Sequence, residues 1–332
     1  MKHDILSYLD KKHGVQNLDP ASLVILPGLV VALNVVSKMA ADMKKSVMTA
    51  TPIYPPFMTS SFNQGSKLVT VPLIYNIDKR DYSLDLELME KLIKRDLVGM
   101  FLLCNPHNPV GKVFSRKELQ ALADLCIRYN VIVCSDEIHC DLILNPDSCE
   151  HVSFLSISGA MERTIVLHAP SKTFNIAGLA AAFAVIPNAT LRAKFKRECL
   201  GDVNVFGYIA LKTAYEDRDG TLEVWKEELR NYLRINVDIV RSFVAQVDPL
   251  LKFEHRHDAT YLIWIDAREL KKQVDTNVQK WLEVNAKVGL NDGSLFGPAG
   301  VYDGYVRLNV GCSKATLEKA LQQLDFAIRK LM

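Results

Sequence analysis

Short apolar segments alternate with longer stretches of mixed polarity through the first two thirds of the chain. The apolar segments are rich in valine, isoleucine and leucine and lack polar alternation, which is typical of strands buried on both faces. The repeated strand-then-helix order predicts an α/β fold with a mostly parallel sheet. The seven predicted strands cover residues 23–26, 46–49, 67–73, 98–103, 131–134, 164–167 and 180–186.

The stretches between these strands are predicted to be helices. In residues 116–129, "RKELQALADLCIRY", the apolar residues recur at three- and four-residue spacing. Ser115 precedes this stretch and Glu118 follows three residues later, which predicts a capping box at the start of the helix.

The pattern changes near residue 219 and indicates a second domain. "DGTLEVWKEELRNYLRINVDIVRSFVAQV" predicts one long amphipathic helix. Strand-like "ATYLIWID", a helix over 274–284, strand-like "YVRLNV" and a terminal helix from Lys314 follow. We therefore predict a large domain at 1–218 and a smaller α+β domain at 219–332, and a length of 332 residues suits two domains.

Composition narrows the class of protein. Hydrophobic residues make up 49% of the chain and the net charge is +2, which favours neither nucleic-acid binding nor a polybasic membrane patch. The longest apolar run, "ASLVILPGLVVALNVV", is interrupted by Pro27 and Gly28 and is too short to span a bilayer. The cysteines number seven and form no CxxC pair, which favours the reducing cytoplasm over a disulfide framework.

Three predicted strands end in residues that could bind a ligand, because ligands of open α/β sheets gather at the carboxyl ends of strands. Gly28 lies where a strand becomes a helix and could let backbone N–H groups approach an anion, although such turns are also common packing features. Asn108 in "CNPHNPVGKVF" could present an amide or only shape the turn. Asp136 follows an apolar strand, where a carboxylate is costly unless a cation or donor meets it.

A fourth strand leads to Lys172 in "HAPSKTFNIAGLAAAFAV", an otherwise uncharged stretch. Burial lowers the pKa of a lysine, and a neutral amine reacts with a carbonyl to give a Schiff base. A Schiff-base lysine, a carboxylate for a pyridine nitrogen and an anion seat are what pyridoxal 5′-phosphate requires of its protein. The combination of Lys172, Asp136 and Gly28 therefore predicts this cofactor.

Other sites are not favoured by the sequence. His139 and Asp141 lie close together, but without further nearby ligands they form a poor metal pattern. The run "HRH" at 255–257 is expected to be a solvated turn rather than a metal cluster. Adjacent side chains such as His139 and Cys140 point apart, so we expect no dyad between them and no metal at the site.

Four motifs carry a resemblance to a known family: "NPHNPVGKVF", "SDEIHCDL", "SKTFNIAGL" and "YVRLNV". They resemble the pyridoxal phosphate-dependent class I/II aminotransferase superfamily of fold type I, and within it the cystathionine β-lyase branch of C–S lyases. The resemblance covers nearly the whole chain. It implies a large domain with a mostly parallel seven-stranded sheet, a smaller C-terminal domain, and a homodimer with sites at the interface.

The resemblance also implies a role for individual residues. Lys172 would form the Schiff base with the cofactor, and Asp136 would pair with the ring nitrogen. Arg307 would bind the substrate α-carboxylate, a bidentate contact that suits guanidinium. The remaining implied contacts are Asn108 and His139 near the ring hydroxyl O3′, Tyr54 on the ring face, and Gly28, Leu29 and Ser171 at the phosphate.

The sequence departs from the family pattern at three places. Ala180 stands where many aminotransferases have a phosphate-binding arginine, and the lyase branch lacks that arginine too. Ala169 stands where many members have a serine. Relatives also carry a leading arm before the helix that matches "ILSYLDKKHG"; it helps to build the small domain and the dimer, so cofactor affinity and activity are expected to depend on it.

These features leave three functional hypotheses. The first is a C–S β-lyase that converts L-cystathionine or another cysteine S-conjugate to pyruvate, ammonia and a thiol. The second is an aminotransferase of amino acids, which would use the same Lys172, Asp136 and Arg307. The third, motivated by the missing arm, is a non-catalytic protein that keeps the fold.

Overall fold

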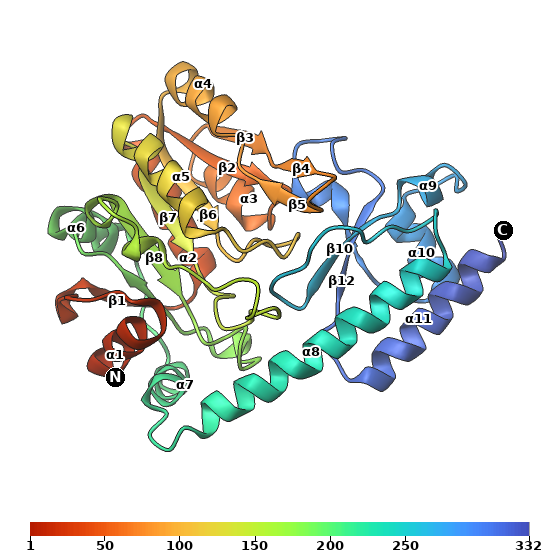
Figure 1. Ribbon diagram of the computed structural model, residues 1–332. Coiled ribbons are helices and arrows are strands. Elements are labelled where there is room, and N and C mark those ends of the chain that lie inside the picture. Colours follow the sequence, from red (N-terminus) through yellow and green to blue (C-terminus); the bar gives the residue numbers. More distant parts are fainter. Residues whose placement is uncertain (332) are drawn as a thin grey trace.

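The first part of the chain folds around a seven-stranded sheet, as seen in a computed structural model that describes residues 1–331 (Figure 1). The strand order is β1-β9-β8-β7-β6-β2-β3. β9 pairs antiparallel with both β1 and β8, and the other neighbours pair parallel. The predicted mostly parallel sheet is thus confirmed. Its strands are β1 (Leu23–Leu26), β2 (Ser46–Thr51), β3 (Leu68–Pro72), β6 (Val98–Cys104), β7 (Ile132–Asp136), β8 (Thr164–His168) and β9 (Ala182–Val185).

All seven predicted strands are present, and the differences lie at their ends. β7 continues through two polar residues to Asp136, because β6 and β8 pair with it along that length. β9 begins at Ala182 rather than residue 180, because Ala180 is left-handed at φ 48° and ends a 3-10 turn. The short hairpin of β4 (Ile74–Asn76) and β5 (Asp81–Ser83) was not predicted.

Helices cover both faces of this sheet, which explains why its strands are apolar throughout. Successive strand residues pack into different cores: Val47 and Met100 face one core, whereas Met48 and Phe101 face the other. Ser115 and Glu118 form the predicted capping box of α5. One face carries α1 (Lys2–His13), α4 (Leu86–Asp96), α5 (Arg116–Arg128) and α7 (Val205–Glu216), and the other carries α2 (Leu29–Asp42), α3 (Pro56–Asn63) and α6 (Ala189–Glu198).

The last third of the chain forms a smaller antiparallel sheet with its own core. Figure 1 shows the long α8 (Thr221–Gln246) passing beneath the molecule towards this sheet, with α11 (Lys314–Arg329) beside it. The sheet has the order β10-β12-β11, with β10 (Leu262–Asp266), β11 (Asn291–Asp292) and β12 (Tyr305–Asn309). The helix predicted over 274–284 begins later, as α10 (Val278–Ala286), and the short α9 (Arg268–Lys271) precedes it.

The two parts share side chains across the predicted boundary at 218/219. Leu142 and Leu144, from the loop after β7, pack into the core formed by α8 and the small sheet. The boundary itself falls just before α8 and stays a prediction. Five short 3-10 helices complete the elements: Pro20–Ser22, Phe154–Ser156, Met161–Arg163, Ala177–Leu179 and Gly293–Phe296.

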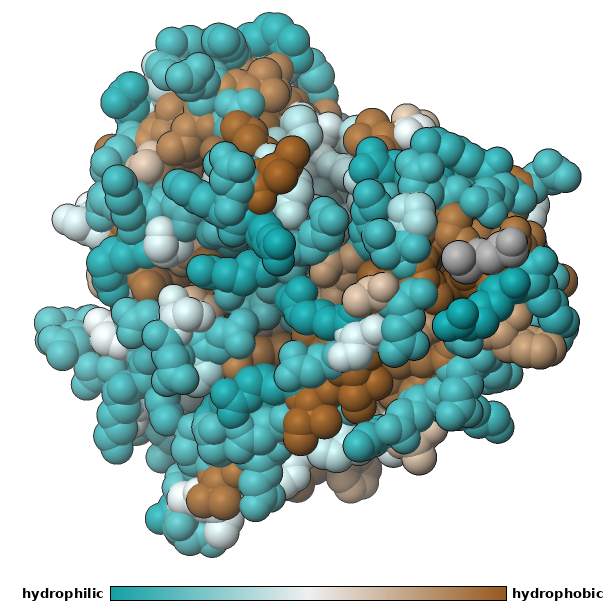
Figure 2. Space-filling model, turned by 45° about the vertical axis from the view of Figure 1, so that its right-hand side comes forward, coloured by the Kyte–Doolittle hydropathy of each residue, from teal (hydrophilic) through white to brown (hydrophobic). Residues whose placement is uncertain are grey.

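Surface and burial add two findings. No helix within residues 1–331 is long and apolar enough to cross a membrane. The face shown in Figure 2 is mostly hydrophilic, with apolar side chains in separate patches.

The expectation of a solvated turn at 255–257 is wrong for two of its residues, because His255 and His257 are buried against the ring of Phe253.

Candidate active site

A cavity of about 410 Å³ opens where the carboxyl ends of β6, β7 and β8 meet the small sheet. Its wall combines the start of α2, the loops after the three strands, and residues of β10 and β12. This is the place where open α/β sheets bind ligands. All nine residues singled out in the sequence line it: Gly28, Leu29, Tyr54, Asn108, Asp136, His139, Ser171, Lys172 and Arg307.

The start of α2 forms a seat suited to an anion. Gly28 caps this helix of 14 residues with φ 131°, a conformation that L side chains rarely adopt. A Cβ at this position would have nothing within 4 Å, so the space beside the backbone is open. The free N–H groups of the first helical turn and the helix dipole favour a negative group there, and Ser171 adds a hydroxyl to the same cavity.

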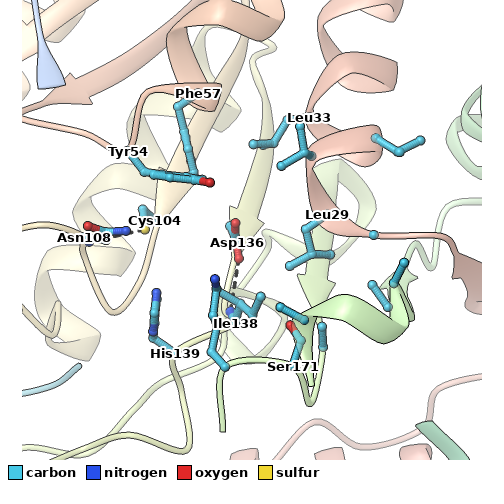
Figure 3. A pocket seen from close by; sticks show the side chains of 18 of the residues that line it. Leu29, Leu33, Tyr54, Phe57, Cys104, Asn108, Asp136, Ile138, His139 and Ser171 are labelled. Atoms are coloured by element: carbon cyan, nitrogen blue, oxygen red, sulfur yellow. Dashed lines mark hydrogen bonds between the residues drawn. The ribbon is translucent and has the colours of Figure 1, made fainter. Parts of the chain in front are cut away.

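Asp136 is a buried carboxyl at the end of the central strand β7 (Figure 3). Its Oδ1 accepts a hydrogen bond from the backbone N–H of Ile138 at 3.1 Å. Burial raises the pKa of Asp136 to about 7, while that hydrogen bond and the positive charge of Lys172 oppose the rise. A carboxylate held at this cost gains strongly from a cationic N–H partner in the cavity.

Lys172 lies in the turn that follows β8 and reaches the same cavity. Its side chain is half-buried rather than fully enclosed. Desolvation lowers the pKa of the Lys172 ammonium, against the attraction of Asp136. The lysine is therefore more readily neutral, and nucleophilic, than an exposed lysine.

Four neutral side chains form part of the cavity wall near Asp136 (Figure 3). Tyr54 and Phe57, from the start of α3, lie together on one side of the cavity, and Asn108 and His139 lie on another. Burial lowers the pKa of His139 to about 3, so its imidazole is neutral. Its Nδ1 is buried and has no hydrogen-bond partner in residues 1–331.

Arg307 enters the cavity from the small sheet and is held by two amides. Its Nη1 donates to Oδ1 of Asn108 at 2.9 Å, and its Nη2 donates to Oδ1 of Asn291 at 2.8 Å. The guanidinium Nε also donates to Oδ1 of Asn291, at 3.2 Å. Because both partners are neutral, these bonds orient the guanidinium without cancelling its charge.

Sequence reasoning missed several residues of this site. Phe57, Cys104 and Tyr261 line the cavity, and Asn291 contacts Arg307 through the pairing of β11 with β12. Tyr261 directly precedes β10 and Asn291 belongs to β11. Neither carries a local motif, so only tertiary structure brings them to the cavity. Ala169 and Ala180, where many relatives have a serine and an arginine, also line it.

The residues present fit pyridoxal 5′-phosphate. The open backbone at Gly28 suits its phosphate, the buried Asp136 suits a protonated ring nitrogen, and the His139 imidazole lines the same cavity. Lys172 supplies the amine that this cofactor requires of its protein. Fold and site together define a pyridoxal phosphate-dependent enzyme of fold type I.

Comparison with known proteins places the chain more narrowly. Residues 1–324 match the family "Aminotransferase class I and II", to which the chain belongs. Cystathionine beta-lyase PatB of Bacillus subtilis is 35% identical, over 98% of this chain and 82% of its own length. The crystal structure of cystalysin from Treponema denticola, which contains pyridoxal 5′-phosphate, superposes with a TM-score of 0.89 at 28% identity, covering 100% of this chain and 82% of that one.

A further structure supports the same branch. The pyridoxal phosphate-bound C–S lyase from Staphylococcus hominis superposes with a TM-score of 0.88 at 27% identity, covering 98% of this chain and 81% of that one. The chain is thus a member of the C–S lyase and cystathionine β-lyase branch, and pyridoxal 5′-phosphate is its cofactor. The predicted family, fold and cofactor are confirmed.

Proposed function

We propose that this protein is a C–S β-lyase that cleaves L-cystathionine or a related cysteine S-conjugate to pyruvate, ammonia and a thiol. The observation that carries the proposal is the convergence of Lys172, Asp136 and Arg307 on one cavity in a chain of the lyase branch. Ala180 supports lyase over aminotransferase chemistry, because the arginine of many aminotransferases is absent at that position.

The cofactor, when bound, supplies an aldehyde for the substrate amine and a ring that withdraws electrons from the substrate α-carbon. Lys172 would hold it through Nζ and would supply the amine that accepts the proton from the substrate Cα as general base. The Asp136 carboxylate would accept a hydrogen bond from the ring nitrogen and keep that nitrogen protonated. Backbone N–H groups of Gly28 and Leu29, with the Ser171 hydroxyl, would bind the phosphate.

The remaining residues orient the reactants. Asn108 and His139 would contact the ring hydroxyl, and Tyr54 would pack against the ring. Arg307 binds the α-carboxylate of the substrate through the N–H groups that its two amide partners leave free, which presents the Cα proton to Lys172. Removal of that proton allows the β-thiolate to leave.

A direct assay tests this function. Purified holoenzyme is given L-cystathionine, and pyruvate and free thiol are measured without any 2-oxo acid. Equal release of both products is expected. Turnover only after a 2-oxo acid is added would show an aminotransferase instead, and no turnover under either condition, with the cofactor bound, would show a non-catalytic protein.

We also propose a homodimer whose second copy borders the cavity. Val205, Phe206 and Ile209 expose apolar side chains on α7. The start of α7 is tied to the cavity wall, because Asn204 Nδ2 donates to the backbone oxygen of Leu179 at 2.8 Å. A second copy covering this face would shield the apolar side chains and narrow the cavity.

Sedimentation of variants tests the dimer. Phe206→Asp is expected to give monomers with weaker cofactor binding, because it places a charge in the proposed interface. Phe326→Asp changes an equally prominent exposed phenylalanine on α11 and should leave the oligomeric state unchanged. A wild-type protein that sediments as a monomer would contradict the proposal.

Asn291 is expected to set the affinity for the substrate carboxylate by positioning Arg307. Asn291→Asp would place a carboxylate against the Arg307 guanidinium and compete with the substrate carboxylate for it. KM should therefore rise by about tenfold or more while kcat changes little. Asn285→Asp adds the same charge on α10 and is the matched control. Steady-state kinetics of both variants separates the effects, and an unchanged KM for Asn291→Asp would show that this contact is dispensable.

A further inference from the structure

A buried cluster of histidine, cysteine and tyrosine lies behind the active site. α1 contributes Tyr8 and His13, the turn after β7 contributes Cys140, and the last residue of β8 is His168. His139 lines the cofactor cavity, whereas the next residue, Cys140, points into this cluster, as expected for adjacent side chains. The cluster is therefore separate from the residues assigned to the cofactor and the substrate.

Three potential metal ligands come together in it. One ligand atom each of His13, Cys140 and His168 lie within 4.8 Å of one another. The Cys140 Sγ to His168 Nε2 distance is 2.9 Å. In a tetrahedral zinc site, ligand atoms lie about 3.5 Å apart, given Zn–N and Zn–S bonds of about 2.0–2.3 Å. The observed separations, 2.9 Å for one pair and no more than 4.8 Å for any pair, lie around this spacing.

The surroundings prepare these groups for a cation. The Tyr215 hydroxyl lies 2.9 Å from His168 Nδ1, which fixes the ring and directs Nε2 towards the sulfur, as second partners of metal-binding histidines do. His13 Nδ1 is buried without a hydrogen-bond partner in residues 1–331.

Charged groups around the cluster leave room for a positive ion. Glu137 contacts His151 Nε2 at 3.1 Å, and the His151 ring lies against that of His13. Asp141 accepts from the Tyr8 hydroxyl at 2.9 Å, and Lys226 lies 3.3 Å from the same carboxylate. Arg230 also donates to the Asp141 backbone oxygen at 3.3 Å, and both Lys226 and Arg230 are paired with Glu223. Glu137 and Asp141 would each attract a divalent cation bound in the cluster.

We propose that His13, Cys140 and His168 bind a thiophilic divalent metal ion such as zinc. The Tyr8 hydroxyl lies beside them, 3.2 Å from His13 Nε2 and 3.7 Å from Cys140 Sγ. Two imidazoles and one thiolate are a donor set that favours zinc over magnesium or calcium. Binding forms a metal–sulfur bond and releases the thiol proton of Cys140 to solvent, with no change in oxidation state. The ion would tie α1 to the turn after β7 and to β8, so its role is structural.

The spacing of the ligands explains why the sequence did not predict this site. Residues 13, 140 and 168 lie far apart along the chain and match no compact metal motif. His139 and Asp141, which lie close together in the sequence, are not among the three potential metal ligands of this cluster.

Metal retention by the holoenzyme tests the proposal. The protein is incubated with Zn²⁺ or Co²⁺ and passed through gel filtration, and the retained metal is measured by mass spectrometry. We expect stoichiometric retention by the wild type, and for the Co²⁺ form d–d absorption at longer wavelength than the lysine–cofactor band. Cys140→Ala and His13→Gln should each bind at least about tenfold more weakly.

Matched controls separate this site from adventitious binding and from misfolding. Cys126→Ala removes an equally buried cysteine on α5 and should retain the metal. Retention of the lysine–cofactor absorbance band and of helical circular dichroism shows that each variant is folded. Wild-type protein that retains no stoichiometric metal, or folded Cys140→Ala and His13→Gln proteins that retain as much as wild type, would overturn the proposal.

Discussion

Replacing Lys172 with alanine is expected to lower kcat by at least about 10⁴-fold, the largest effect of any single substitution in the cavity. The variant loses both the covalent hold on the cofactor and the base that takes the Cα proton. Folding should be unaffected, because the side chain is only half-buried and contributes little to the core. Lys172→Arg keeps a positive charge in the cavity but cannot supply a neutral amine, so it should be equally inactive.

Chemical trapping checks the same assignment without relying on activity. Reduction of the wild-type holoenzyme with borohydride should fix the cofactor on Lys172, and peptide mapping locates the label. Neither the alanine nor the arginine variant should carry a label after the same treatment. A label on another lysine, or substantial turnover by Lys172→Ala, would refute the assignment of this residue.

The sequence was informative where burial alone decides structure. The strands of the large sheet are apolar on both faces, so their positions followed from hydrophobic runs, and only ends such as Asp136 and Ala180 were displaced. Polar residues joined β7 because neighbouring strands pair with it, which no local pattern indicates. The left-handed conformation of Ala180 likewise depends on the tertiary fold.

The site was predictable to the extent that its residues belong to motifs at strand ends. Asp136 and Lys172 stood out because charged residues are rare beside buried strands. Asn291 and Tyr261 did not, because they reach the cavity through a second sheet whose position relative to the first is a property of the whole fold. The cluster of His13, Cys140 and His168 was missed for the same reason.

Asp136→Asn is expected to act in opposite directions on the cofactor-free protein and on the enzyme. In the cofactor-free protein the carboxyl pKa is about 7, above its unfolded value of 3.8, because burial disfavours the charged form. The folded state therefore holds a proton that the unfolded state has lost between these values. The contribution of this proton to the free energy of unfolding is greatest at low pH and falls as the pH rises from 3.8 to about 7.

The size of this effect follows from linkage. Between pH 5 and pH 8 the wild-type protein should lose about 2–3 kcal/mol of unfolding free energy through this group, whereas Asp136→Asn should not. Urea unfolding of the two cofactor-free proteins at both pH values measures this difference. The unfolding free energy of Asp136→Asn relative to wild type should rise with pH. Asp124→Asn, which removes an exposed carboxylate on α5, should show no such gain.

The same substitution should damage the enzyme. An amide cannot keep the ring nitrogen protonated as a carboxylate does, so kcat should fall on the order of 10²–10³-fold and the cofactor should dissociate more readily. Burial of the Asp136 carboxylate lowers the stability of the cofactor-free protein. The cationic ring would offset that cost when it binds. If Asp136→Asn showed the same stability relative to wild type at pH 5 and pH 8, the carboxylate would not be destabilised by burial, and this account of Asp136 would be wrong.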